Sequence, residues 1–328
     1  MRIYLNDMLF ALSYALDCVE QDVVGVTTNH GKRVAYMAVR MARQLGMSDE
    51  DMVALAGLAI MHDNALTEYL HEEYEGEEEN LEQKDSKERE RQKGHQERGN
   101  ILLCHCVLGE QNVRQMPFRG ASENVVLYHH EHADGSGPFG KKTREVPVGA
   151  ILIHIADQVD ARWRLGSLTR EDYDKMLAWL QERRGSIFDD MSVDVFGKAI
   201  SYEEVVMMQQ QPLEQLIYEL LPISQREYSA SEIKDIAALF ATITDYKSKF
   251  TSKHSLGIAQ KAETMGKYYG YSAEKVEELY FAGAFHDVGK LVVDKDILEK
   301  PDKLTDVEYK HIRTMLITHT RYYRKSRG

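Results

Sequence analysis

The chain has 328 residues and a formal net charge of −12, from 53 acidic and 41 basic side chains. No sustained basic face offsets this charge, which argues against a protein that binds nucleic-acid polymers or an anionic membrane. The length predicts about two domains, and a hydrophobic content of 43% is sufficient for two buried cores.

The N-terminal segment is a poor signal peptide because Asp7 and other polar residues interrupt it. No apolar run reaches the ~20 residues that a membrane helix requires. Three cysteines, Cys18, Cys104 and Cys106, fit a reducing compartment better than a disulfide framework. We therefore expect a soluble cytoplasmic protein. The group Cys104-His105-Cys106 resembles a ligand cluster, but its apolar helical surroundings favour packing.

Apolar residues recur at helical spacing almost throughout the chain, and there are only six prolines. The prediction is an all-α fold. Gly46 ends one helix, and Ser48 is the expected N-cap of the next, with Asp51 three residues on. Residues 72–98 are highly charged, and we interpret them as a solvated helix or loop rather than a functional lid.

A repeat with an offset of 224 residues organises the chain. His30, His62, Asp63 and His95 return as His254, His286, Asp287 and His319, and the Gly46–Ser48 turn returns at Gly270–Ser272. The first copy continues into His129, His130 and Asp157, whereas a second copy would need positions 353, 354 and 381. We expect a complete first module over residues 1–222, closed by the helices of 169–222, and a partial second module over 223–328.

The first copy offers five imidazoles and two carboxylates in the order His30, His62, Asp63, His95, His129, His130 and Asp157. This donor set suits two borderline divalent ions such as iron, manganese, cobalt, nickel or zinc. Asp63 can bridge two ions that lie roughly 3.5–4 Å apart.

Asp157 ends an apolar helical run, where an unpaired carboxylate would be costly, so a metal ligand is favoured there. His154 is interpreted as a neighbour of the site or as packing. Outside the ordered set lie His71, His105, His132 and His311, which are expected to be structural or exposed.

The block His129-His130-Glu131-His132-Ala133-Asp134-Gly135-Ser136-Gly137-Pro138, downstream of His62-Asp63, resembles the HD-GYP branch of the HD phosphohydrolase superfamily. Val125, Val126 and Leu127 lead into this block and are predicted to form a buried helix. The resemblance continues through residues 146–161 and 183–196. The second copy is similar over residues 284–313, which follow the HDxGK pattern of the family.

The resemblance implies a helical-bundle domain that hydrolyses cyclic di-GMP to pGpG or GMP with a metal-activated hydroxide. The seven donors of the first copy would be the metal ligands, with iron or manganese expected, and His62 and Asp63 would be catalytic. It also implies substrate contacts at Gly135, Gly137, Pro138 and Lys141, and a homodimer or a diguanylate-cyclase-type partner.

The first copy departs from the family pattern at several positions. The lysine of HDxGK is Leu66, the tyrosine of GYP is missing before Pro138, an arginine is replaced by Ile151, and residues 72–98 replace the usual connector. Two alternatives therefore stay open: a phosphohydrolase for another nucleotide or phosphate ester, and a binding or sensory module without turnover. The residues of the second copy, which we expect to be vestigial, are His254, His286, Asp287, Lys290 and His319.

Overall fold

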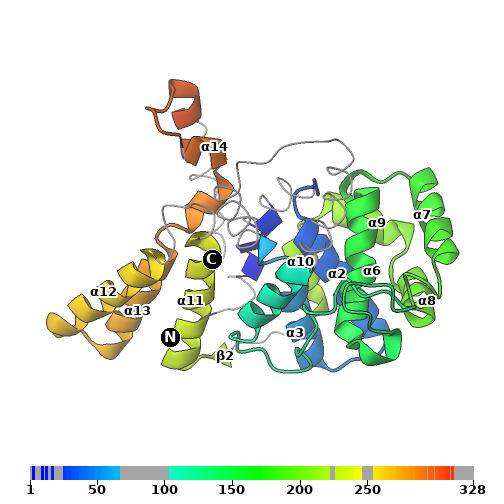
Figure 1. Ribbon diagram of the computed structural model, residues 1–328, viewed down its shortest axis with the longest axis horizontal. Coiled ribbons are helices and arrows are strands. Elements are labelled where there is room, and N and C mark those ends of the chain that lie inside the picture. The colour runs from blue at the N-terminus through cyan, green and yellow to red at the C-terminus, as the bar shows by residue number, and fades with distance from the viewer. Residues whose placement is uncertain are drawn as a thin grey trace, which may run out of the picture.

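The computed structural model describes residues 2–3, 9–10, 12–13, 16–17, 25–66, 103–221, 226–245, 254–293, 295–298, 300–310 and 312–313. These residues form the predicted all-α fold (Figure 1). The helices of the first repeat are α2 (His30–Gln44), α3 (Asp49–Ile60), α6 (Val148–Trp163), α7 (Arg170–Glu182), α8 (Asp190–Ala199), α9 (Tyr202–Gln210) and α10 (Leu213–Leu220), with 3-10 turns η1 (Thr143–Glu145) and η2 (Leu165–Ser167). Residues 103–113 are also helical.

The second repeat contributes α11 (Ala230–Asp245), α12 (His254–Tyr268), α13 (Ala273–Phe285), the 3-10 turn η3 (Val288–Val292) and α14 (Lys295–Leu298). Two short strands, β1 (Arg2–Ile3) and β2 (Arg226–Glu227), pair antiparallel with Arg2 opposite Glu227 and Ile3 opposite Arg226. Arg226 and Glu227 are themselves the counterparts of Arg2 and Ile3 at the repeat offset. The pairing is therefore reciprocal, as at a local two-fold axis.

The equivalent turns of the two repeats have the same local structure. Gly46 and Gly270 are in the left-handed region, at φ 70° and 69°, where glycine adopts the conformation without a Cβ penalty. Ser48 then accepts a hydrogen bond from the backbone N–H of Asp51, and Ser272 accepts one from that of Lys275. The predicted N-cap at Ser48 is confirmed.

Helix α2 is the centre of the first repeat and packs against α3, α6, α8 and α10. The side chain of its N-cap residue, Asn29, makes no capping hydrogen bond to the backbone of the first turn. The carboxylate of Asp17, which lies earlier in the chain, instead accepts the N–H groups of Asn29 and Gly31 at 2.6 and 3.0 Å. This contact closes the start of the helix that carries His30.

Helix α11 joins the two repeats. Ile233, Ile236 and Phe240 on it belong to the main hydrophobic core, while Ala237 and Ala241 pack in a smaller core with α12 and α13. In Figure 1, α12 and α13 lie side by side beyond α11, on the side away from the first repeat.

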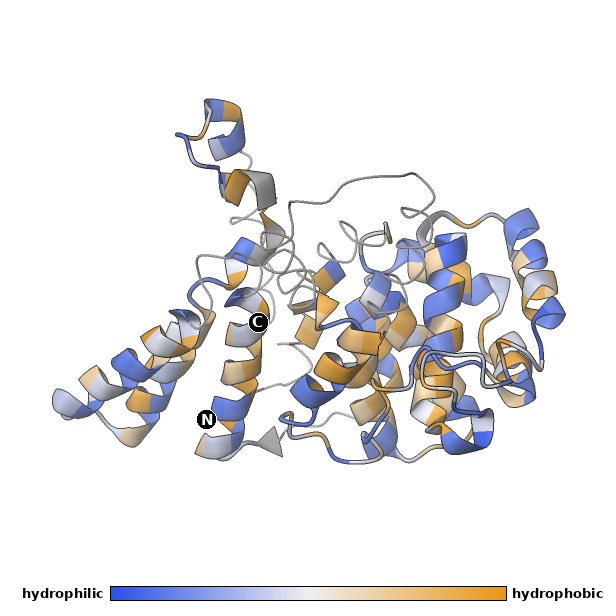
Figure 2. Ribbon diagram, viewed as in Figure 1, coloured by the Kyte–Doolittle hydropathy of each residue, from blue (hydrophilic) through white to orange (hydrophobic). Residues whose placement is uncertain are grey.

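Hydropathy follows this division. The central helices of the first repeat carry the most strongly hydrophobic residues, whereas α12 and α13 are more hydrophilic (Figure 2). Among the described residues, none of the helices combines the length and apolarity that crossing a membrane would demand.

Candidate metal centre

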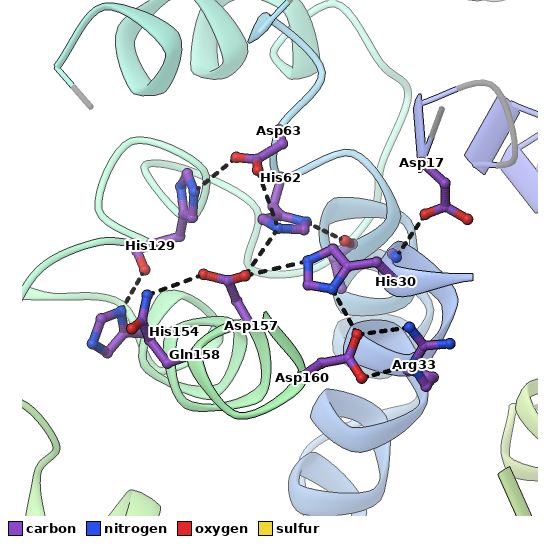
Figure 3. Close-up of polar contacts among 12 residues, drawn as sticks. Asp17, His30, Arg33, His62, Asp63, His129, His154, Asp157, Gln158 and Asp160 are labelled. Carbon is purple, nitrogen blue, oxygen red and sulfur yellow. Dashed lines mark hydrogen bonds and ion pairs between the residues drawn. The ribbon is translucent and has the colours of Figure 1, made fainter. Parts of the chain in front are cut away.

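One set of donors forms where α2, the end of α3 and α6 meet. His30 begins α2, His62 follows α3, and Asp157 lies on the buried face of α6. Oδ1 of Asp157 lies 3.2 Å from Nε2 of His30 and 3.8 Å from Nε2 of His62. Figure 3 shows the carboxylate of Asp157 joined by dashed lines to both imidazoles. The three side chains are buried and could hold one metal ion.

A second set lies across Asp63 from the first. It includes His105 on the helical segment 103–113 and the pair His129-His130. Oδ1 of Asp63 is 3.3 Å from Nε2 of His105 and 3.4 Å from Nε2 of His129, and Oδ2 is 3.7 Å from Nε2 of His62. One carboxylate thus faces both sets with different oxygens, which is the arrangement of a bridging ligand.

Hydrogen bonds at Nδ1 orient the imidazoles. His62 donates Nδ1–H to the carbonyl of Ala59, and His129 donates to that of Val126, at 2.8 and 2.6 Å. A carbonyl only accepts, so the lone pair of each neutral ring lies on Nε2. Nε2 of His129 and Oδ1 of Asp63 are buried without a hydrogen-bond partner among the described residues. A cation between them would satisfy both atoms, so the residues present fit a metal ion.

The orientation of His30 depends on an ion pair beneath it. Oδ2 of Asp160 lies 2.7 Å from Nδ1 of His30, and the same carboxylate accepts Nε and Nη2 of Arg33 at 2.6 and 2.9 Å. Figure 3 shows Asp160 between His30 and Arg33. A carboxylate behind a ligating imidazole fixes its tautomer and raises its basicity.

The two site carboxylates are ionised despite their burial. Burial raises the pKa of Asp63, but His62, His105 and His129 more than offset this and hold its pKa well below the usual value. Burial also raises the pKa of Asp157, but hydrogen bonds with His30 and His62 bring this pKa well below the usual value. Both side chains are therefore available as anionic ligands at neutral pH.

The segment before the histidine pair differs from the sequence prediction. We expected Val125, Val126 and Leu127 to form a buried helix, but residues 123–130 form successive turns. The carboxylate of Glu110 accepts the backbone N–H groups of Asn124 and Leu127, at 2.7 and 3.1 Å. This side chain replaces helical hydrogen bonding and holds the turns in place, so the helix prediction is wrong here.

The Gly-rich loop after the pair is built around Glu131. Its carboxylate accepts the backbone N–H of Phe139 at 2.6 Å and that of Lys141. Gly135 has φ 85°, which favours glycine. The side chain of Lys141 is partly exposed beside Glu145. Behind the loop, His154 donates Nδ1–H to the carbonyl of His129 at 2.9 Å, and burial lowers the pKa of His154 to about 4.

Gly137→Ala is expected to destabilise this loop. A Cβ at Gly137 would lie 2.7 Å from both Cα of Glu131 and the backbone N of His132, so backbone must move. We expect a loss of about 1–3 kcal/mol in the free energy of unfolding, measured by urea denaturation. Gly197→Ala is the matched control, since nothing lies within 4 Å of its Cβ position on α8, and it should stabilise by up to about 1 kcal/mol. Equal stabilities of the two variants would contradict the prediction.

The sequence prediction missed His105. It was interpreted as structural or exposed, yet it is 2% exposed and faces Asp63. A signal was present: His105, Gly109 and Asn112 have the i, i+4, i+7 spacing of one helix face. That face meets the turn after His62, because Nδ2 of Asn112 donates to Oδ1 of Asn64 at 2.8 Å and a Cβ at Gly109 would lie 3.2 Å from the Asn64 amide.

The other predicted ligands divide into two groups. His30, His62, Asp63, His129, His130 and Asp157 come together as described above. His95 lies outside the described residues, as do residues 72–98 and His71, His311 and His319. The assignment of His95 as a ligand stays a prediction. His132 lies on the Gly-rich loop, 2.8 Å from Oγ of Ser136.

The second repeat also gathers part of its set. His254, His286 and Asp287 have ligand atoms within 4.8 Å of one another. Nζ of Lys290, however, lies 2.5 Å from Oδ2 of Asp287. His254 and His286 are 45% and 34% exposed, whereas His30 and His62 are at most 1% exposed. The second set is therefore more open than the first, and its assignment as vestigial stays a prediction.

Comparison with known proteins identifies the class. The HD domain family matches residues 27–162 and 251–323, so both repeats are recognised and together they cover most of the chain. The chain belongs to the HD domain family. This confirms the predicted superfamily and the predicted enzyme class, a metal-dependent phosphohydrolase.

Relatives with assigned activities are cyclic dinucleotide phosphodiesterases. The chain is 29% identical over 317 residues to the 3'3'-cGAMP-specific phosphodiesterase 1 of Vibrio cholerae, covering 94% of this chain and 68% of the relative. It is 24% identical to phosphodiesterase 3 of that organism, with 65% and 46% covered. The cyclic di-GMP phosphodiesterase of Thermotoga maritima is 28% identical, with 48% and 39% covered. The chain therefore spans less than half the length of the last two.

A solved structure supports the fold. The crystal structure of a cyclic GMP-AMP specific phosphodiesterase of V. cholerae superimposes with a TM-score of 0.73, covering 98% of this chain and 80% of the other. The sequences are 19% identical, so this likeness bears on the fold alone.

Proposed function

We propose that this chain is a metal-dependent phosphodiesterase that hydrolyses a cyclic dinucleotide at a dinuclear centre in the first repeat. The observation that carries the proposal is the pair of buried donor sets on either side of Asp63. His30, His62 and Asp157 form one set, and His105, His129 and His130 contribute to the other. Residues 1–222 would form the catalytic module and 223–328 a partial HD module.

The donor chemistry supports two divalent transition-metal ions, with iron or manganese as the expected metals and zinc, nickel or cobalt as further candidates. When bound, such ions make water more acidic and neutralise charge on a phosphoryl oxygen. They would also supply the positive charge that an anionic substrate needs near a chain of net charge −12. His95, if it is a ligand, would complete the predicted set.

The protein's own residues position this chemistry. Asp160 and the carbonyls of Ala59 and Val126 hold the imidazoles with Nε2 turned inward. The loop of Gly135, Gly137, Pro138 and Lys141 lies directly after the histidine pair, and we infer that it contacts the substrate. Leu66 is buried at the position of the family lysine. Because leucine cannot donate a proton, another group would have to protonate the leaving oxygen.

Two substrates are favoured by different observations. The resemblance to HD-GYP domains favours cyclic di-GMP. The relative that matches nearly the whole chain is instead named as specific for 3'3'-cGAMP. Opening of either ring adds one water across a P–O bond and yields a linear dinucleotide. A homodimer, a diguanylate-cyclase-type partner and a cytoplasmic location are further predictions from the sequence.

The test uses the purified protein and counts metal first. Wild-type protein prepared without chelator should contain about two transition-metal ions per chain; fewer than one would contradict the dinuclear centre. Anaerobic incubation with iron or manganese and equal concentrations of cyclic di-GMP and 3'3'-cGAMP, followed by chromatography of the products, then identifies the substrate. Asp63→Ala serves as the blank. Tight binding of a cyclic dinucleotide without formation of product would contradict the enzyme proposal and favour a sensory module.

A further inference from the structure

Cys106 is a buried thiol within the second donor set. Its side chain has 0% exposure and follows His105 on the helical segment 103–113. Sγ lies 3.6 Å from Nε2 of His105 and 3.8 Å from Nδ1 of His129. Ligand atoms of Cys106, His105, His129 and His130 all lie within 4.8 Å of one another.

These separations suit ligands of a common ion. Two donors held 2.0–2.3 Å from a tetrahedral ion are about 3.3–3.7 Å apart. Nε2 of His105 is 3.6 Å from Sγ of Cys106 and 3.3 Å from Oδ1 of Asp63. Both distances from this nitrogen therefore fall within the range expected for ligands of one ion.

A second observation points to a ligand at this place. Nε2 of His129 and Oδ1 of Asp63 face each other at 3.4 Å, are buried, and have no hydrogen-bond partner among the described residues. The His129 side chain has 0% exposure. A cation between them would satisfy the carboxylate oxygen and the imidazole lone pair together.

We propose that Cys106 is a thiolate ligand of the second metal ion, in addition to the histidines and the shared aspartate. The proposal rests on the dinuclear centre proposed above. On binding, the S–H bond breaks, a metal–sulfur bond forms and the proton passes to solvent. A soft sulfur donor favours iron(II), cobalt(II) or zinc(II) over manganese(II) and magnesium(II) at this position.

Cobalt(II) substitution tests the proposal without an activity assay. Metal-free full-length protein is reconstituted with cobalt(II) anaerobically, and the cobalt content and absorption spectrum are recorded for wild type, Cys106→Ser and Cys104→Ser. Cys104 is exposed and two residues away, so it is the matched control. Wild type and Cys104→Ser should show a thiolate-to-cobalt charge-transfer band in the near ultraviolet. Cys106→Ser should lose that band but keep the visible ligand-field bands.

Each outcome is decisive for one of the two proposals. Cobalt-loaded wild type without the charge-transfer band, or a band that survives in Cys106→Ser, overturns thiolate ligation and leaves the dinuclear centre standing. Wild type that takes up less than one cobalt overturns the dinuclear centre itself. Should Cys106→Ser fail to fold, X-ray absorption of zinc-loaded wild type decides: a sulfur scatterer at about 2.3 Å is expected, and nitrogen and oxygen scatterers alone refute it.

Discussion

Asp63→Asn is expected to reduce cyclic dinucleotide hydrolysis by more than about a hundredfold, because loss of a partner that merely orients a ligand already costs 10–100-fold. Asp63 faces both donor sets, Oδ1 toward His105 and His129 and Oδ2 toward His62. An amide has a single oxygen and no negative charge, so it cannot bridge two cations. Product formation and metal content per chain measure the effect, and metal content should fall with activity.

The repeat supplies a matched control for this variant. Asp287 stands at the equivalent position of the second repeat, where Nζ of Lys290 lies against it. Asp287→Asn should leave activity and metal content close to those of wild type. Equal losses in the two variants would show that the second repeat is a working site. Full activity in Asp63→Asn would show that the bridging assignment is wrong.

Asp160→Asn is expected to weaken both metal binding and the fold. The Asp160 carboxylate accepts hydrogen bonds from Arg33 and lies against Nδ1 of His30 in a fully buried position. Asparagine would leave the charge of Arg33 buried without its anionic partner, which costs about 3–5 kcal/mol. Loss of the support for His30 should lower metal affinity by about 10–100-fold.

Two measurements separate these effects. Urea denaturation in the presence of a chelator gives the stability of the metal-free protein, and metal titration gives the affinity. Asp174→Asn is the control, since Asp174 forms an exposed i, i+4 ion pair with Arg170 at 3.6 Å and should change stability by less than about 1 kcal/mol. An Asp160→Asn protein as stable as this control would contradict the role assigned to the buried pair.

Local features were predictable because local spacing encodes them. The N-cap at Ser48 follows from a hydroxyl three residues before a free N–H, and its copy at Ser272 follows from the repeat. The burial of Asp157 follows from its place in an apolar helical run, and the structure shows that side chain beside His30 and His62. In each case the signal lies within a few residues of the feature.

Features that depend on distant contacts were missed. The prediction of a helix at Val125–Leu127 failed because Glu110 accepts the backbone N–H groups of residues 14 and 17 positions later, which a helix would have used internally. His105 was set aside because it has no counterpart in the repeat. Its position beside Asp63 depends on the contact of segment 103–113 with the turn at Asn64, which joins residues 45 and 48 positions apart.

The sequence by itself determined the family, the helical class, the repeat and most of the candidate donor residues, because these depend on residue identity and on spacing along one chain. Tertiary structure alone decided which donors share a position, that Asp63 faces both sets, and that His105 and Cys106 join the second. Ligand geometry is set to a few tenths of an ångström by the packing of helices from distant parts of the chain, and spacing along the sequence carries no such distances.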